Sequence, residues 1–281
     1  MRDIQQEITQ KFITAIESGI SATGTWQRPW QRLATEGAAV NAKTGKEYRG
    51  MNALILSLSG CQTWAGYGQW AEKGCQVRKG EKGTSILAPL IKKDAETGKD
   101  SLFGFRGVSV FSADQVDGWI EPAAPTISTI APVAAAAALI AASGATIKHG
   151  GDSAHYVPSM DYIQLPHMAA FSTAEGYYGT ALHELSHWTG HSSRLDRNLN
   201  HGRFGDDAYA FEELVAELSS AFLCATTKVH LGYMDNHARY LAGWLRVLKN
   251  DSKALMSAAA AAQKAHDYIA GEELTALEKV A

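Results

Sequence analysis

Two stretches of the chain repeat apolar residues every three or four positions. The first stretch ends at Gly19, and its apolar residues are Ile4, Ile8, Phe12, Ile13 and Ile16. The second lies within residues 206–227, and its apolar residues are Phe211, Leu214, Val215, Leu218 and Phe222. This spacing gathers apolar side chains on one face of a helix. We therefore expect an amphipathic helix in each stretch, with Asp206 or Asp207 as the cap of the second.

The composition changes near residue 120, where Pro, Ala, Ser and Thr are concentrated between two patterned regions. This change predicts a linker over residues 121–132, followed by an alanine-rich helix from Val133 to Ser143. A length of 281 residues suits two domains, which we place at 1–120 and 133–281. Because both regions mix helical patterns with strand-like segments, the expected fold class is α+β.

The charge of the chain is small and unevenly distributed. The whole sequence has a net charge of -3, which does not indicate a nucleic-acid-binding protein. Residues 1–85, however, hold 11 basic and 7 acidic residues, whereas residues 86–281 hold 15 basic and 22 acidic residues. Any basic surface is therefore expected to be local.

Three cysteines, Cys61, Cys75 and Cys224, fit neither a disulfide framework nor a C-x-x-C metal motif. The N-terminal residues lack the pattern of a secretory signal, and the longest apolar stretch, Val133 to Ala142, is about half of the ~20 residues that a membrane span needs. These features predict a cytoplasmic protein that does not associate with membranes.

Aromatic and basic residues alternate through the first domain. The candidates for nucleic-acid contacts are Trp26, Arg28, Trp30, Lys43, Tyr48, Arg49, Trp64, Arg78, Lys79 and Lys82. Single-stranded nucleic acid is held by this combination, because bases stack on aromatic rings while Lys and Arg contact phosphates. Tryptophans are also common core residues, so burial of these rings is the alternative interpretation.

The second domain contains H-E-x-x-H within a predicted helix. Ser172 and Glu175 form a candidate capping box, and the motif itself is His183, Glu184 and His187. A spacing of four residues puts both imidazoles on one helix face, where they can bind one zinc ion. Glu184 lies beside them and is the candidate catalytic base for a metal-bound water. This pattern is typical of a zinc metallopeptidase.

A third metal ligand is expected from the helix that follows. A metzincin histidine is excluded because position 193 is serine, and His191 is a further turn away from His187. Glu213 and Glu217 fall together on the face opposite the apolar stripe, which makes Glu213 the expected ligand and Glu217 the alternate. Two nitrogens and one oxygen suit zinc, with manganese possible in exchange. A solvated pair of glutamates is the alternative.

The order of motifs TWQRPW, TGKEYRGMN, VRKGEKGT, YIQLP, HELSHWTGH, RFGDDAYAFEELVAEL and HARYLAGWLRVLKND resembles the ArdC antirestriction family of conjugative plasmids along essentially the whole chain. The resemblance implies an N-terminal domain that binds single-stranded DNA without strong sequence preference and a C-terminal zincin-like metallopeptidase domain. It also implies protection of transferred plasmid DNA from host restriction during conjugation. Family motifs fall on His183, Glu184 and His187, and on Glu213 and Glu217.

Three functional interpretations remain open from the sequence. In the first, the DNA-binding domain protects the transferred strand. In the second, the peptidase domain cleaves a restriction subunit or another DNA-bound protein. In the third, the metal has only a structural role and holds two helices together. The family's N-terminal module also occurs in plasmid primases, which adds a primase accessory role as an alternative. The candidate donors to an oxyanion are Tyr209, His201, His230 and Tyr233.

Overall fold

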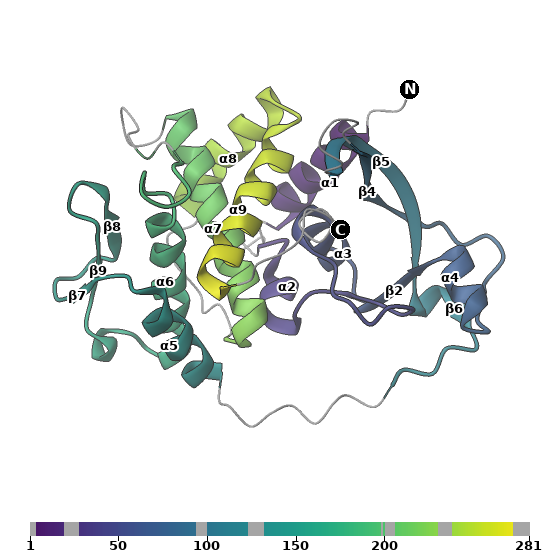
Figure 1. Cartoon of the computed structure of the whole chain (residues 1–281), viewed down its shortest axis with the longest axis horizontal. Helices are drawn as coiled ribbons and strands as arrows, with labels where there is room; N and C mark the ends of the chain where they lie inside the picture. The colour runs from purple at the N-terminus through teal and green to yellow at the C-terminus, as the bar shows by residue number, and fades with distance from the viewer. Residues whose placement is uncertain are drawn as a thin grey trace. The chain divides into compact units, whose positions relative to one another are not determined.

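The structure is a computed structural model, which describes residues 4–19, 28–93, 100–122, 132–197, 199, 206–229 and 238–271. These residues form two compact units. The first unit contains residues 4–19, 28–37 and the described part of 132–271, and the second contains residues 38–93 and 100–122. Helices dominate the first unit and strands dominate the second (Figure 1). The expected α+β fold class is confirmed.

The first unit is built around one helix. Its described helices are α1 (Ile4–Ser18), α2 (Gln31–Glu36), α5 (Pro132–Ser143), α6 (Ala174–Trp188), α7 (Asp207–Thr227), α8 (Ala238–Asn250) and α9 (Ala254–Ala270). Helix α7 packs against α2, α5, α6, α8 and α9 (Figure 1). Every α7 residue from Glu212 to Ala225 is buried, on all sides of the helix. The face opposite the apolar stripe is therefore inside the unit and not solvated.

A small sheet precedes α6 in the first unit. Its strands are β7 (Ile147–His149), β8 (His155–Val157) and β9 (Tyr162–Leu165), in the order β7-β9-β8. Strand β9 pairs parallel with β7 and antiparallel with β8, and both β8 and β9 pack against α6. The short 3-10 helices Pro158–Met160 and Met168–Ala170 flank β9.

The caps of α6 and α7 explain where these two helices begin. The Thr173 hydroxyl accepts a hydrogen bond from the Gly176 amide at 3.0 Å, so the cap of α6 is Thr173 and not Ser172. The expected Ser172 capping box is thus wrong by one residue, because the two hydroxyl residues are adjacent and only the backbone path selects one. The Asp206 carboxylate accepts from the Tyr209 amide at 2.7 Å, which confirms Asp206 as the cap of α7.

The second unit contains a four-stranded sheet in the order β1-β2-β5-β4. Its strands are β1 (Val40–Asn41), β2 (Thr63–Gly66), β4 (Thr84–Lys93) and β5 (Asp100–Ser112), and β4 and β5 form a long antiparallel pair. The remaining elements are α3 (Gly50–Ser57), α4 (Tyr67–Glu72), the pair β3 (Gln76–Val77) and β6 (Val116–Asp117), and the 3-10 helix Ala113–Gln115. The glycine-containing segment 78–83 connects β3 to β4.

The division into units differs from the domains expected from the sequence. Residues 4–37 were expected in the N-terminal domain, but α1 packs on α8 and α2 packs on α7 in the first unit. The apolar face of α1 explains this placement, since Phe12 is fully buried and its ring stacks on Trp30 with centroids 6.4 Å apart. Periodicity shows that such a face exists, but it does not show which partner covers it.

None of the helices within the described residues is both long and apolar enough to span a bilayer. Cys61, Cys75 and Cys224 are all free cysteines, in agreement with the absence of a disulfide framework in the sequence.

Asn52 holds α3 against the edge strand β4, and its loss tests this packing. Its side-chain amide donates to the Leu87 carbonyl and accepts from the Leu87 amide, both at 2.9 Å. In an Asn52→Leu variant both buried backbone groups of Leu87 lose their partner, at about 1–3 kcal/mol each. We expect urea denaturation to report a loss of about 2–6 kcal/mol in the free energy of unfolding.

Ser57→Ala on the same helix is the control, because the Ser57 hydroxyl bonds only locally, to the Leu54 carbonyl at 2.8 Å. We expect a loss of about 1 kcal/mol or less. Equal losses in the two variants would contradict the role of Asn52.

Candidate metal centre

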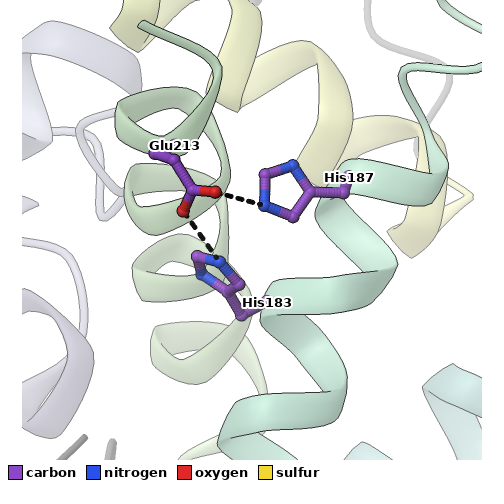
Figure 2. A group of neighbouring side chains, drawn as sticks. All are labelled: His183, His187 and Glu213. Carbon is purple, nitrogen blue, oxygen red and sulfur yellow. Dashed lines mark ion pairs between the residues drawn. The ribbon is translucent and has the colours of Figure 1, made fainter. Parts of the chain in front are cut away.

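His183 and His187 lie one turn apart on α6 and face α7. Their ring centroids are 4.9 Å apart and their planes are inclined at 82°. Both belong to a helical segment that is buried along most of its length. Each ring directs its Nε2 atom toward α7, where both dashed lines in Figure 2 end on Glu213.

Glu213 on α7 supplies the third group at this point. Its Oε2 atom lies 3.6 Å from His183 Nε2, and its Oε1 atom lies 3.8 Å from His187 Nε2 (Figure 2). One ligand atom from each of the three residues lies within 4.8 Å of the others. Atoms that share a tetrahedral zinc at about 2.0–2.1 Å are about 3.4 Å apart. The three side chains are thus spaced as ligands of one metal ion.

On the side of His187 away from Glu213, the ring contacts a carboxylate, which in turn contacts a guanidinium. His187 Nδ1 lies 3.2 Å from Glu212 Oε1, and Arg197 donates to both oxygens of Glu212, at 2.8 and 3.0 Å. Arg197 also donates to the Ser186 carbonyl and the Thr189 hydroxyl, each at 2.8 Å. A carboxylate on the second nitrogen of a histidine fixes the ring and its tautomer. Arg197 in turn anchors that carboxylate to α6.

Behind His183, the partner is Glu217. His183 Nδ1 lies 3.8 Å from Glu217 Oε2. The other oxygen of Glu217 accepts from Arg28 Nε at 2.7 Å and from Trp30 Nε1 at 3.2 Å. Glu217 therefore stands on the far side of His183 from Glu213, whose oxygens face both Nε2 atoms. The geometry favours Glu213 over Glu217 as the third ligand.

The pKa values in the cluster reflect this crowding of charge. Burial alone lowers the pKa of His187, but the hydrogen bond with Glu212 and the charges of Glu213, Glu212 and Glu184 raise it to about 9. Burial raises the pKa of Glu213, yet its contacts with His183 and His187 outweigh this and lower it to about 2. Glu213 is thus ionised at neutral pH, as a metal ligand must be.

Buried charge also fits a divalent cation. Glu184, Glu212, Glu213 and Glu217 are all buried, whereas the guanidinium groups that contact them come from Arg28 and Arg197. Within the described residues the cluster therefore carries two more carboxylates than guanidiniums when both histidines are neutral. An ion of charge +2 balances this excess, so the donor set and the charge both fit the metal that H-E-x-x-H indicates.

Tyr209 is the one oxyanion-donor candidate that lies in the described residues, since His201, His230 and Tyr233 lie outside them. Its hydroxyl is hydrogen-bonded to Glu213 and lies 3.3 Å from the Tyr240 hydroxyl. Burial and the charge of Glu213 raise the pKa of Tyr209, so the hydroxyl keeps its proton. His191 contacts Ser193 and does not belong to the His–His–Glu group.

Three aromatic residues expected to stack on bases are core residues instead. Trp30 is 0 % exposed, and Tyr48 and Trp64 are also buried. Their polar atoms bond internally: Trp64 Nε1 donates to the Cys61 carbonyl at 2.8 Å, and the Asn41 amide donates to the Tyr48 hydroxyl at 2.9 Å. The expectation that these rings are exposed is therefore wrong. An aromatic beside a cation has the same local sequence whether its ring faces the core or the solvent.

Among the cations expected to meet phosphates, Arg28 is buried against Glu217 and does not reach the surface. Lys79 and Lys82 are exposed in the turn between β3 and β4. Lys43 and Arg78 are exposed and pair with nearby carboxylates, and Arg49 is half-buried. The expected contact Trp26 lies outside the described residues.

Glu212 and Arg197 were not expected at the site from the sequence. Glu212 directly precedes Glu213, so its position one residue before a candidate ligand is the only sequence signal. Arg197 lies in the segment after α6 and contacts α7 only in the folded chain.

Family models match both parts of the chain. Residues 2–111 match the model described as the N-terminal domain of anti-restriction factor ArdC, and residues 134–261 match the zincin-like metallopeptidase model. Among curated proteins, the uncharacterized protein y4eC of Sinorhizobium fredii is 37% identical over 96% of this chain and 92% of its own length. DNA primase TraC of Escherichia coli is 38% identical over 95% of this chain, which spans only 27% of that primase.

Solved structures give the same relationship. The metal-free structure of antirestriction ArdC protein from plasmid R388 is 36% identical, with a TM-score of 0.76 over 96% of this chain and 97% of that protein. The Mn(II)-bound structure of the same protein is 34% identical, with a TM-score of 0.79 over 96% of this chain and 98% of that protein. Because these relatives and both family models span the chain almost from end to end, it belongs to the ArdC antirestriction family.

Proposed function

We propose that this protein protects transferred plasmid DNA from restriction by binding it as a single strand, and that its first unit is a zinc-type metallopeptidase. The observation that carries the peptidase assignment is the convergence of His183, His187 and Glu213 beside the buried Glu184. Membership of the ArdC family supports the antirestriction role. The protein acts in the cytoplasm of the cell that receives the DNA.

In the proposed site, His183, His187 and Glu213 hold the metal, and Tyr209 orients Glu213 through its hydroxyl. When bound, the metal supplies a Lewis acid that polarises a peptide carbonyl and acidifies water. Glu184 accepts the proton of the attacking water and returns it to the leaving amine. Its burial next to His183 removes it from bulk solvent, which favours proton transfer to substrate over exchange with water.

Two imidazoles and one carboxylate favour zinc, while the carboxylate and an open position also admit manganese. The Mn(II)-bound structure of ArdC from plasmid R388 supports this second metal. We therefore propose zinc as the resident ion, with manganese accepted in its place.

For DNA, we propose the surface formed by Tyr67 and the turn at residues 78–83. Tyr67 is 54% exposed, and its ring meets Phe111 edge-on with centroids 6.3 Å apart. A Cβ atom on Gly83 would lie 3.1 Å from the Phe111 ring, so this turn and Tyr67 flank the same aromatic residue. Lys79 and Lys82 in the turn add exposed positive charge. An exposed ring beside two lysines matches what a single strand requires.

A second function is supported by the likeness to TraC, a primase of which this chain spans 27%. In that interpretation the chain is an accessory that brings single-stranded DNA to another enzyme. Cleavage of a restriction subunit or another DNA-bound protein is a third outcome, in which the DNA surface only delivers the peptidase to its substrate.

The metal assignment predicts that His183→Ala and Glu213→Gln each abolish stoichiometric zinc binding, because each removes one of three ligands. Glu212→Gln leaves the ligands in place and weakens binding about 10–100-fold, the usual effect of losing a partner of a metal-bound histidine. Equilibrium dialysis followed by metal analysis measures both effects.

Glu175→Gln, which changes a carboxylate on the first turn of α6, is the control and keeps wild-type zinc binding. Zinc retained by Glu213→Gln but lost from Glu217→Gln would make Glu217 the third ligand.

The DNA assignment predicts that the full-length protein binds a single strand more tightly than a duplex. Tyr67→Ala lowers the affinity by about 1–3 kcal/mol through lost stacking. Lys79→Ala combined with Lys82→Ala reduces the slope of log affinity against log salt by about 1.4, or about 0.7 for each lost phosphate contact. Fluorescence anisotropy across a salt series measures both effects.

The matched control is Lys253→Ala with Lys264→Ala, which removes two exposed lysines from the first unit. Equal affinity for single and double strands, or no dependence on salt, would contradict the proposed surface.

Glu184→Gln separates the DNA-binding role from the peptidase role. The amide keeps the size of the side chain but cannot accept a proton, so we expect zinc and DNA binding to persist while hydrolysis is lost. Because restriction enzymes act on DNA, we expect this variant to retain antirestriction during conjugation into a restricting recipient. The triple variant at Tyr67, Lys79 and Lys82 should lose it. Protection lost in Glu184→Gln alone would make proteolysis the primary function.

A further inference from the structure

Two side chains from the N-terminal segment contact Glu217, the carboxylate next to His183. Arg28 and Trp30 both donate to the same atom, Glu217 Oε1, at 2.7 and 3.2 Å. The side chains of Arg28 and Glu217 are 6% and 1% exposed, and Trp30 is 0% exposed. Residues 28 and 30 directly precede α2, which packs against the helix that carries Glu217. The contact is therefore an internal part of the first unit.

The surroundings of Trp30 hold its indole N–H in one direction. Its ring stacks on Phe12 and contacts Trp244, with centroids 6.4 and 5.9 Å away. Rings packed in a core at this density cannot turn without displacing their neighbours. The indole N–H and the guanidinium therefore fix one oxygen of Glu217, and the carboxylate plane leaves the other oxygen directed to His183 Nδ1, at 3.8 Å.

We propose that Arg28 and Trp30 are positioning residues of the metal site, an inference that rests on the proposed function of the His–His–Glu cluster as a metal centre. They hold Glu217 so that its Oε2 atom faces the Nδ1 atom of His183, at 3.8 Å, and leaves Nε2 as the ligand atom. A histidine that binds metal through one nitrogen donates from the other, and its acceptor sets both tautomer and ring orientation.

The arrangement around His187 supports this role independently. There, Glu212 accepts from Nδ1 and Arg197 holds Glu212 with two hydrogen bonds. The Nδ1 atom of each histidine thus faces a carboxylate, and each of these carboxylates contacts a guanidinium. The difference is the origin of the guanidinium, which comes from the segment after α6 in one case and from the residues before α2 in the other.

The test compares zinc affinity and cobalt spectra of the full-length protein and its variants. Zinc affinity is measured by competition with a chelator, and the visible d–d bands of bound Co²⁺ report the coordination geometry. We expect Arg28→Gln to weaken zinc binding about 10–100-fold and to change the cobalt bands. Trp30→Phe, which keeps a ring in the core and loses only the N–H, should shift both readouts in the same direction by a smaller amount.

Adding Arg28→Gln to Glu217→Gln should weaken binding no further than Glu217→Gln alone, because Arg28 acts only through that carboxylate. Arg28→Lys, which retains the charge, should recover part of the lost affinity. Single-stranded DNA affinity should stay at the wild-type value in Arg28→Gln, since this side chain is buried in the first unit.

Two control variants make the same kinds of substitution, arginine to glutamine and tryptophan to phenylalanine, away from Glu217. Arg194→Gln removes another buried arginine of the first unit, which pairs with Asp161, and Trp70→Phe removes an indole N–H that donates to the Phe111 carbonyl at 3.0 Å. Both should lower thermal stability without changing zinc affinity or the cobalt bands.

The inference is overturned if Arg28→Gln and Trp30→Phe behave like these controls, with lower stability and unchanged metal readouts. If Arg28→Gln does not fold, Trp30→Phe decides by the same criterion. Failure of the unaltered protein to bind zinc or cobalt stoichiometrically is a different result, which would overturn the proposed function and this inference together.

Discussion

Negative charge buried where α6 meets α7 is the constraint on which the first unit depends. Glu184, Glu212, Glu213 and Glu217 lie inside a core that is otherwise mostly apolar. Placing an ionised carboxylate there costs several kcal/mol unless a partner compensates. Helix packing at this contact can therefore be stable only if cations are brought to fixed positions around it. Arg28 and Arg197 meet part of this requirement, and a divalent metal held by the neutral histidines meets the remainder.

This constraint explains why residues far apart in the sequence converge on α7. A helix buried on all sides has no solvent to screen its glutamates, so each must find a donor on a neighbouring element. Glu212 finds Arg197 in the segment after α6, and Glu217 finds Arg28 and Trp30 before α2. The same contacts that stabilise the core thus orient the imidazoles, and stability and site geometry cannot be varied independently here.

The parts that could be predicted from the sequence are those set by short-range geometry. His183 and His187 are four residues apart, so helix geometry alone brings them together, and the same rule paired Glu213 with Glu217. Contacts between distant elements follow no such rule. Trp30 and Trp64 beside cations were expected at the surface, because local sequence does not encode the side from which a ring is covered. The unit to which α1 belongs could not be predicted for the same reason, because its apolar face could pack against any apolar surface.

The distance along the chain between Trp30 and Glu217, 187 residues, has a consequence for biosynthesis. The described residues of the second unit, 38–93 and 100–122, are all synthesised before α7, and the segment with Arg28 and Trp30 emerges even earlier. Arg28 and Trp30 can make their contact with Glu217 only after α7 has been translated. The two histidines are synthesised before Glu213 as well, so the cluster is completed only when about three quarters of the chain exists. Metal loading is therefore a late step in the maturation of the protein, after the residues of the second unit that form the proposed DNA surface have been made.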